Sequence, residues 1–234
     1  YNLRRLDSCG GKVLNEEAYE KWGDGRTQNL VVVFASNNAP RKPVYFEWQR
    51  SFSNTKDEAN YDVLFFRDQS KKWYIGGVPG IGKNIAHTTA FLKKQIQSYD
   101  NVIFMGVSAG GYASILFGSI LNVNATFSFI PQTDLVFAQN SCPKNWKWAI
   151  CDKALKKLKT YDKYKNLVDY INDTTDYYLY TYNSDTDCQH GPHHLKNISK
   201  YKNVYKLDVS HSEFMPTKFK ELSKKYFKSN DGSK

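Results

Sequence analysis

Short apolar runs alternate with helical patterns along most of this chain, and this alternation restricts its fold more than any other feature. Continuous apolar runs are typical of strands buried in a parallel sheet. The sequence predicts such strands at 30–35, 61–66, 102–105 and 177–182, with two weaker candidates at 125–130 and 204–209. Apolar residues at helical spacing predict helices over 85–96, over 109 to about 121 and over 215–226. The alternation predicts a three-layer α/β sandwich with a mainly parallel sheet.

The same pattern predicts how the chain is organised. It has 234 residues, and no repeat or low-complexity linker divides it, so we expect a single domain over 1–234. The segment 138–176 is polar, Lys-rich and irregular, which favours a small insertion over one sheet edge. The first residues contain neither an initiator Met nor an apolar signal core, which suggests an excerpt of a longer chain and gives no support for secretion.

Composition and charge exclude several function classes. The net charge is +10, but the excess Lys is spread through helical stretches instead of concentrated with aromatic residues, so we expect no nucleic-acid partner. The longest apolar run, 30–35, is too short to span a bilayer, so we expect no membrane partner. Four cysteines without CxxC spacing indicate neither a zinc site nor a redox pair and are compatible with a cytoplasmic protein.

A nucleophile candidate follows the strand at 102–105. The run Gly106-Val107-Ser108-Ala109-Gly110 has the G-x-S-x-G pattern and leads directly into the helix predicted from Ala109. A sharp strand-to-helix turn would hold Ser108 in a strained conformation with its hydroxyl exposed, and would leave no room for side chains at positions 106 and 110. The Ala109 N–H at the helix start would then face the oxyanion of a tetrahedral intermediate. The alternative is a glycine-lined turn in which Ser108 only caps the helix.

With this turn in its strand and helix context, the chain resembles the α/β-hydrolase fold family over roughly residues 28–228. The resemblance implies a triad in the order Ser, acid, His. His211, after the run 204–209, stands where the family keeps its general base. The acid is expected after the strand at 177–182, and a small residue three positions before it favours Asp187 over Asp185, which stays open as the alternate.

Two further parts of an acyl-transfer site are expected from the same resemblance. A second oxyanion donor should come from the loop after the first core strand, where the backbone N–H of Ser36 or Asn37, or the Asn37 side chain, would serve; an Asx-turn is the alternative. Trp146 and Trp148 fall where the family inserts caps, and their indoles could stack on a sugar ring or an acyl group, or pack on the body of the domain.

A closer resemblance concerns the chemistry of the substrate. The segments 36–38, 66–68, 73–74, 77–82, 106–111 and 131–133 look like those of small hydrolase-like domains found beside glycosyltransferases in capsular-polysaccharide and large-virus glycan systems. This resemblance implies a small-molecule or glycan ester as substrate, and fusion to or association with a glycosyltransferase. The expected activity is that of a serine esterase or an acyltransferase, with no cofactor and no metal.

Three other interpretations compete with this one. A hydrolase-like module without catalysis would bind a glycan or a partner domain. The segment 77–84 nearly matches a phosphate-binding loop, but Asn84 replaces the Ser/Thr that ligates magnesium, which favours a glycine-rich loop before a helix. The histidines of 190–194 lie near Asp185, Asp187 and Cys188, but their spacing fits no strong zinc pattern and favours a solvated helix start.

Overall fold

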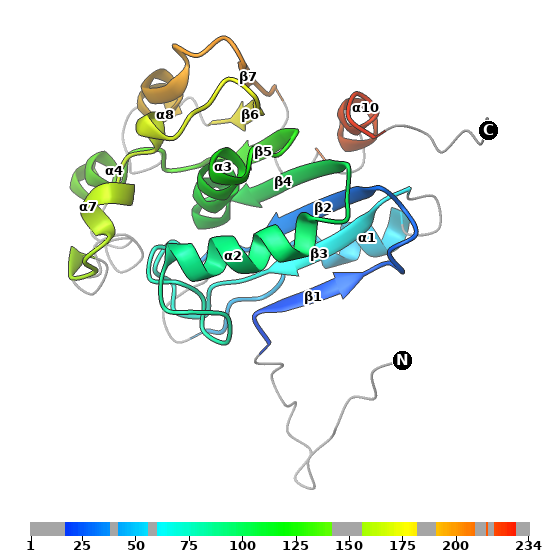
Figure 1. The fold of residues 1–234 in the computed structure, drawn as a ribbon. Helices are drawn as coiled ribbons and strands as arrows, with labels where there is room; N and C mark the ends of the chain where they lie inside the picture. The colour runs from blue at the N-terminus through cyan, green and yellow to red at the C-terminus, as the bar shows by residue number, and fades with distance from the viewer. Residues whose placement is uncertain are drawn as a thin grey trace, which may run out of the picture.

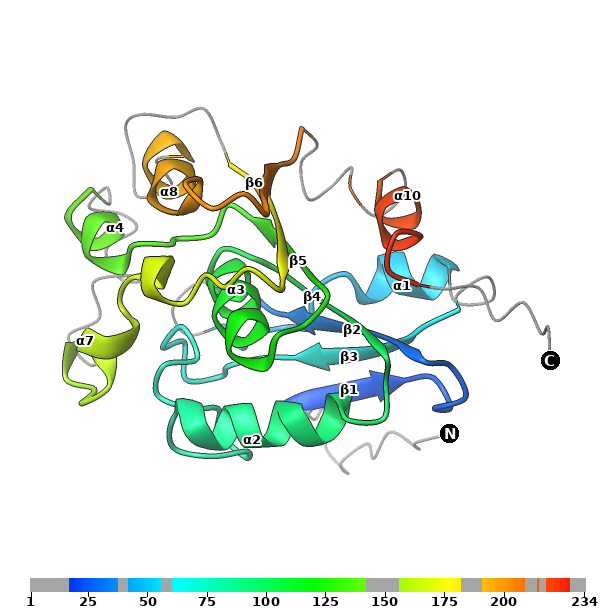
Figure 2. The ribbon, with the colours of Figure 1, turned by 45° about the horizontal axis from the view of Figure 1, so that its top comes forward.

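A seven-stranded sheet lies at the centre of the chain in the computed structural model, with helices on both faces (Figures 1 and 2). The structure describes residues 17–37, 42–55, 60–141, 156–181, 191–208, 214 and 218–227. The strands are β1 (Tyr19–Trp22), β2 (Asn29–Phe34), β3 (Asp62–Phe66), β4 (Asn101–Val107), β5 (Ala125–Phe129), β6 (Asp176–Tyr180) and β7 (Val204–Lys206). The helices are α1 (Gln49–Thr55), α2 (Ile85–Ile96), α3 (Ala109–Leu121), α4 (Leu135–Ser141), α7 (Tyr161–Tyr164), the 3-10 helix η3 (Leu167–Asp169), α8 (Gly191–Ile198) and α10 (Phe219–Ser223).

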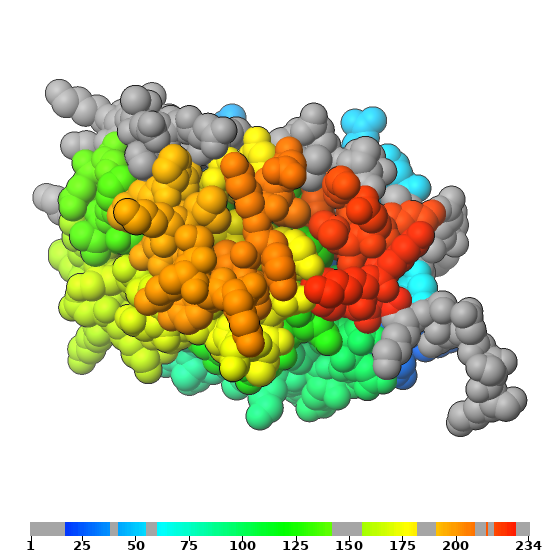
Figure 3. Space-filling view, turned by 90° about the horizontal axis from the view of Figure 1, so that it is seen from above, coloured from blue at the N-terminus to red at the C-terminus, as the bar shows by residue number. Residues whose placement is uncertain are grey.

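The strand order is β1-β3-β2-β4-β5-β6-β7, and only the edge strand β1 runs antiparallel to its neighbour within the described sheet. All six predicted strands are present, which confirms the predicted mainly parallel α/β sandwich. The last strand is shorter than expected, because Leu207 and Asp208 follow β7 without strand structure. Figure 3 shows the segment of α8 and β7 at the surface beside the segment around α10.

The sequence analysis did not predict β1, α1, α4, α7 or η3, and the first two show why. β1 has alternating half-buried and exposed residues and little apolar character, because an edge strand covers the core with one face only. α1 buries one large side chain, Phe52, so it lacks the repeated apolar spacing of an amphipathic helix. The predicted C-terminal helix is represented by α10, which begins at Phe219.

The core lies in two layers, one on each face of the sheet. Leu30, Val32 and Phe34 of β2 pack in the layer with α2 and α3, whereas Val31 and Val33 pack in the layer with α1 and α10. Figure 2 shows where these helices lie around the sheet. This strict alternation follows from the two-residue period of a strand. Because both faces are covered, β2 is buried along its whole length, and ligands can reach the central strands only at their ends.

Candidate active site

Ser108 occupies a sharp turn between β4 and α3. Its backbone has φ 52° and ψ −115°, a conformation that residues with a side chain rarely adopt. The turn is held on both sides, since the Ser108 N–H donates to the Phe129 carbonyl and the Ser108 carbonyl accepts from Tyr112 N–H, each at 2.9 Å. The residue is only partly buried, unlike its neighbours in β4 and α3. The strand, turn and helix predicted around Ser108 are therefore present, and the surroundings maintain the strained conformation.

Two glycines allow this turn to form. A Cβ on Gly106 would lie 2.3 Å from backbone atoms of Gly110, and a Cβ on Gly110 would lie 2.1 Å from the Phe34 carbonyl oxygen. The start of α3 is thus in direct contact with the end of β2. The loop after β2, which contains Ser36 and Asn37, therefore begins beside the start of α3.

The register of the sheet places three loops at one edge. Phe34 of β2 pairs with Gly106 of β4, and Val107 of β4 pairs with Phe129 of β5. The chain therefore leaves β2, β4 and β5 side by side, at the carboxyl ends of parallel strands where α/β sheets bind ligands. The loop after β5 supplies Gln132, which the sequence analysis did not select as a site residue. The Ser108 hydroxyl donates to Gln132 Oε1 at 3.3 Å, and Gln132 Nε2 donates to the Ile130 carbonyl at 2.9 Å.

The buried side chain of Tyr74 holds the backbone directly before the expected oxyanion loop. Tyr74 donates its hydroxyl proton to the Ala35 carbonyl at 2.8 Å, and the Ala35 N–H donates to the Phe66 carbonyl at 2.9 Å. Tyr74 is in turn fixed by Asp68, whose carboxylate accepts the backbone N–H groups of Ser70, Lys72 and Tyr74. Burial raises the pKa of Asp68, and these hydrogen bonds oppose the rise. The polar network therefore fixes the backbone just before Ser36.

Glu47 is a site residue that the sequence analysis missed. The Ser36 hydroxyl donates to Glu47 Oε1, and Glu47 Oε2 is buried without a hydrogen-bond partner among the described residues. Burial raises the pKa of Glu47 from 4.5 to about 7, against the opposing effect of hydrogen bonds from Ser36. A carboxyl group that titrates near neutral pH thus lies beside the loop next to Ser108. No local pattern marks Glu47, because the burial of its carboxyl group depends on how the chain packs around it.

The raised pKa gives a stability prediction for Glu47→Gln. The folded chain holds this proton more tightly than the unfolded chain, so the free energy of unfolding should fall as pH rises from about 4.5 to about 7. Between pH 5 and pH 8 the wild type should lose about 2.5 kcal/mol through this group, and Glu47→Gln should lack that loss. Urea unfolding at both pH values measures it. Glu221→Gln, at an exposed ion pair with Lys218, is the control and should follow the wild type. Equal pH dependence in Glu47→Gln and wild type would contradict the raised pKa.

Several solved structures have a fold similar to that of this chain. The chain is similar to the capsule O-acetyltransferase of Neisseria meningitidis serogroup A, with 16% identity, a TM-score of 0.59 and 91% of each chain covered. It is also similar to a lipase/esterase from Lactobacillus plantarum, with 9% identity, a TM-score of 0.54, and 84% of this chain and 86% of that chain covered. The chain has an α/β-hydrolase-like fold. This confirms the fold that the resemblance implied.

A third structure with this α/β-hydrolase-like fold belongs to a glycosylation-associated protein complex from Streptococcus agalactiae, with 15% identity and a TM-score of 0.59. The match covers 94% of this chain and 46% of that chain. No protein-family model matches the chain. No curated protein matches it either. At these identities the likeness concerns the fold, so the chemistry has to be argued from the residues.

Several predicted site residues lie outside the described residues: Asp185, Asp187, His211, Trp146 and Trp148. The strands before the first three are described. β6 and β7 run parallel to β4, so the chain leaves both at the edge of the α/β-hydrolase-like sheet where Ser108 lies. The role of these residues stays a prediction.

The segments that carried competing interpretations have local structural roles. Asn84 caps α2, accepting the His87 N–H at 2.9 Å, and Gly77 is required because a Cβ would lie 2.3 Å from the Gly82 carbonyl oxygen. This agrees with a glycine-rich loop before a helix. His193 and His194 lie in α8: His193 contacts Asp134 at 3.3 Å, and His194 is buried, so the expected solvated helix start is wrong for His194. Its ring fills space against Thr133 and Phe137 instead.

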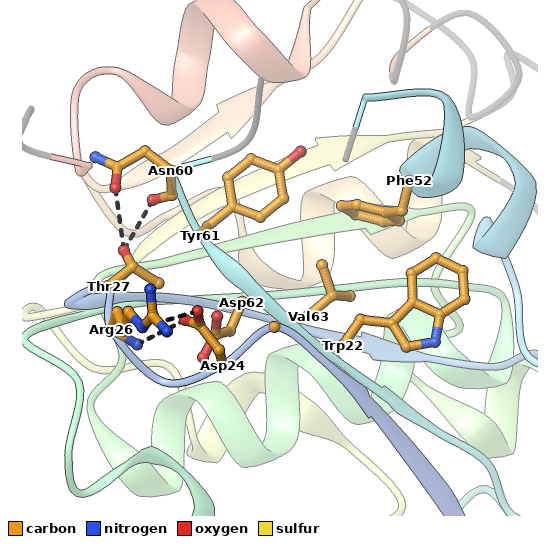
Figure 4. A pocket seen from close by; sticks show the side chains of 10 residues that line it. Trp22, Asp24, Arg26, Thr27, Phe52, Asn60, Tyr61, Asp62 and Val63 are labelled. Atoms are coloured by element: carbon orange, nitrogen blue, oxygen red, sulfur yellow. Dashed lines mark hydrogen bonds and ion pairs between the residues drawn. The ribbon is translucent and has the colours of Figure 1, made fainter. Parts of the chain in front are cut away.

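A hollow of about 550 Å³ lies at the end of the sheet opposite to Ser108 (Figure 4). Trp22 and Tyr61 line it together with Asp24, Arg26 and Asn60. It opens at the amino-terminal ends of β2 and β3, roughly 20 Å from Ser108 along the strands. It is therefore too far away to hold the reacting group of a substrate. None of the described helices is long and apolar enough to cross a membrane.

Proposed function

We propose that this chain is a serine-dependent acyl-ester hydrolase or acyltransferase. The strained Ser108 turn, with φ 52° at the junction of β4 and α3, is the observation that carries the proposal. A side chain held in this conformation costs stability, and such strain persists mainly at functional sites. Structural neighbours that include an O-acetyltransferase and an esterase support this choice of chemistry.

In the proposed mechanism the Ser108 Oγ attacks the ester carbonyl carbon while His211 takes the Ser108 proton. A C–O bond forms, and the carbonyl oxygen becomes an oxyanion, which accepts hydrogen bonds from the Ala109 N–H and from the Ser36 or Asn37 segment. The intermediate then collapses: the ester C–O bond breaks, and His211 gives its proton to the leaving alcohol. Asp187, or Asp185, orients His211. Water or a sugar hydroxyl removes the acyl group from Ser108 by the same steps in reverse.

We further propose that the acyl group is carried by a carbohydrate. The named neighbours support this, because one is a capsule O-acetyltransferase and another belongs to a glycosylation-associated complex. Trp146 and Trp148 are the proposed stacking surface for a sugar ring. Association with a glycosyltransferase and a cytoplasmic location belong to the same proposal.

Labelling with a fluorophosphonate tests this function. The reagent should form a bond between phosphorus and Ser108 Oγ with loss of fluoride, and mass mapping should find the adduct on Ser108 alone. His211→Ala and one of Asp187→Asn and Asp185→Asn should slow labelling by about 100-fold or more, because the base and its orienting group are lost. Ser114→Ala is the control, since Ser114 is buried in α3. A folded wild type that stays unlabelled would support a non-catalytic glycan- or partner-binding module instead.

A further inference from the structure

The position of Glu47 in the fold follows from its two neighbours. The Phe46 ring lies 6.2 Å from the Phe65 ring of β3, and the Trp48 ring lies 5.5 Å from the Phe129 ring of β5. In the sheet, β2 and β4 lie between β3 and β5. Residues 46–48 therefore cross the carboxyl ends of β2 and β4. Glu47 lies at the middle of this crossing, where Ser36 and Ser108 leave the sheet.

The hydrogen bond from Ser36 fixes this position. Glu47 Oε1 accepts the Ser36 hydroxyl, and Oε2 is buried without a hydrogen-bond partner among the described residues. The backbone is held tightly here, since Trp48 has a φ of 56°, which is costly for a bulky residue. The surroundings thus force a carboxyl group into a buried place next to the proposed oxyanion loop.

We infer that Glu47 is a positioning residue of the acyl-transfer site: in its neutral form it holds the loop of Ser36 and Asn37 in place for oxyanion binding, and in its ionised form it opposes oxyanion binding. The inference rests on the proposed function. A neutral acid accepts the Ser36 bond without adding charge. An ionised Glu47 places a negative charge behind the oxyanion in a water-poor environment, where repulsion is strong.

Among the described residues, the charged and titratable groups on the segments next to this crossing have partners of their own. On the segment after β3, Asp68 accepts three backbone N–H groups, Lys71 Nζ donates to the Lys42 carbonyl at 2.6 Å, and the Arg67 guanidinium lies 4.1 Å from the Phe46 ring. Tyr74 lies in the same segment, and its pKa is raised first by burial and then by the charges of Asp68 and Glu47. On β1, Glu20 accepts from Gln49 at 2.9 Å. Burial is thus the main cause that raises the pKa of Glu47 to about 7.

The test is the rate of fluorophosphonate labelling of Ser108 between pH 5 and pH 9.5. The wild-type rate should rise as the His211 base deprotonates and fall again near pH 7 as Glu47 ionises. Glu47→Gln keeps a neutral acceptor for Ser36, so the fall should disappear, and at pH 8.5 the variant should label about thirtyfold faster than the wild type. Glu47→Ala should be slow at every pH because Ser36 loses its acceptor. Glu221→Gln is the surface control.

A second variant keeps the inference testable if Glu47→Gln does not fold. Ser36→Ala loses the same hydrogen bond and should label more slowly than the wild type; because the Ser36 hydroxyl lowers the pKa of Glu47, the alkaline fall of this variant should also move to higher pH. An alkaline fall that is unchanged in Glu47→Gln or in Ser36→Ala overturns the role of Glu47 and leaves the hydrolase proposal intact. Absence of labelling in the folded wild type at every pH overturns both.

Discussion

Ser108→Gly is expected to abolish acyl transfer and to stabilise the fold. Both Ser108→Gly and Ser108→Ala remove the Oγ, so ester hydrolysis should fall by about 10⁴-fold or more in each. They differ in stability. Alanine keeps a Cβ at φ 52°, whereas glycine adopts this region freely, so Ser108→Gly should be more stable than Ser108→Ala by about 1 kcal/mol. Ester turnover and urea unfolding of the two variants measure these effects.

The comparison of the two variants separates function from strain. A catalytic Ser108 in a relaxed turn would give two inactive variants of equal stability, which would contradict the strain argument alone. A strained but non-catalytic Ser108 would give the stability difference without loss of esterase activity. Only the combination of lost activity and a more stable glycine variant fits a strained turn that holds a catalytic nucleophile.

The second large effect is expected at Gly110. In Gly110→Ala the new Cβ would lie 2.1 Å from the Phe34 carbonyl oxygen and 2.8 Å from its carbon. These are backbone atoms of a buried central strand, so neither side can move away cheaply. We expect a loss of about 3 kcal/mol or more in the free energy of unfolding, together with loss of Ser108 labelling, because α3 and the end of β2 would separate.

A matched glycine shows whether this cost is steric. Gly25 has a φ of 75°, and a Cβ added there would have no atom within 4 Å, so Gly25→Ala should cost only the conformational penalty of about 1 kcal/mol. In Gly110→Ala the reverse holds: the helical backbone at position 110 adds no conformational penalty, so the whole loss of stability comes from the steric contact with Phe34. Thermal or urea unfolding of both variants measures the difference. If Gly110→Ala unfolds within about 1 kcal/mol of the wild type, the close contact between α3 and β2 is wrong.

The predictable part of the fold and site is the part encoded in local pattern. Buried parallel strands need continuous apolar runs, so β2, β3, β4, β5 and β6 could be recognised before any contact was known. The turn at Ser108 was equally predictable, because the glycines at 106 and 110 stand at fixed offsets from it between a strand and a helix. Edge strand β1 and helix α1 lack such patterns, since each buries only part of its surface.

The sequence by itself determined the α/β class, the strands of the parallel sheet and the place of the candidate nucleophile, since each depends on residues close together in the chain. Only the tertiary structure decided that Glu47 and Gln132 lie beside the same site. Glu47 is 11 residues from Ser36 and reaches it because aromatic neighbours anchor it across the ends of four strands. The carboxyl group is buried, and its pKa is raised, because of that packing. The residues next to Glu47 in the sequence do not indicate this burial.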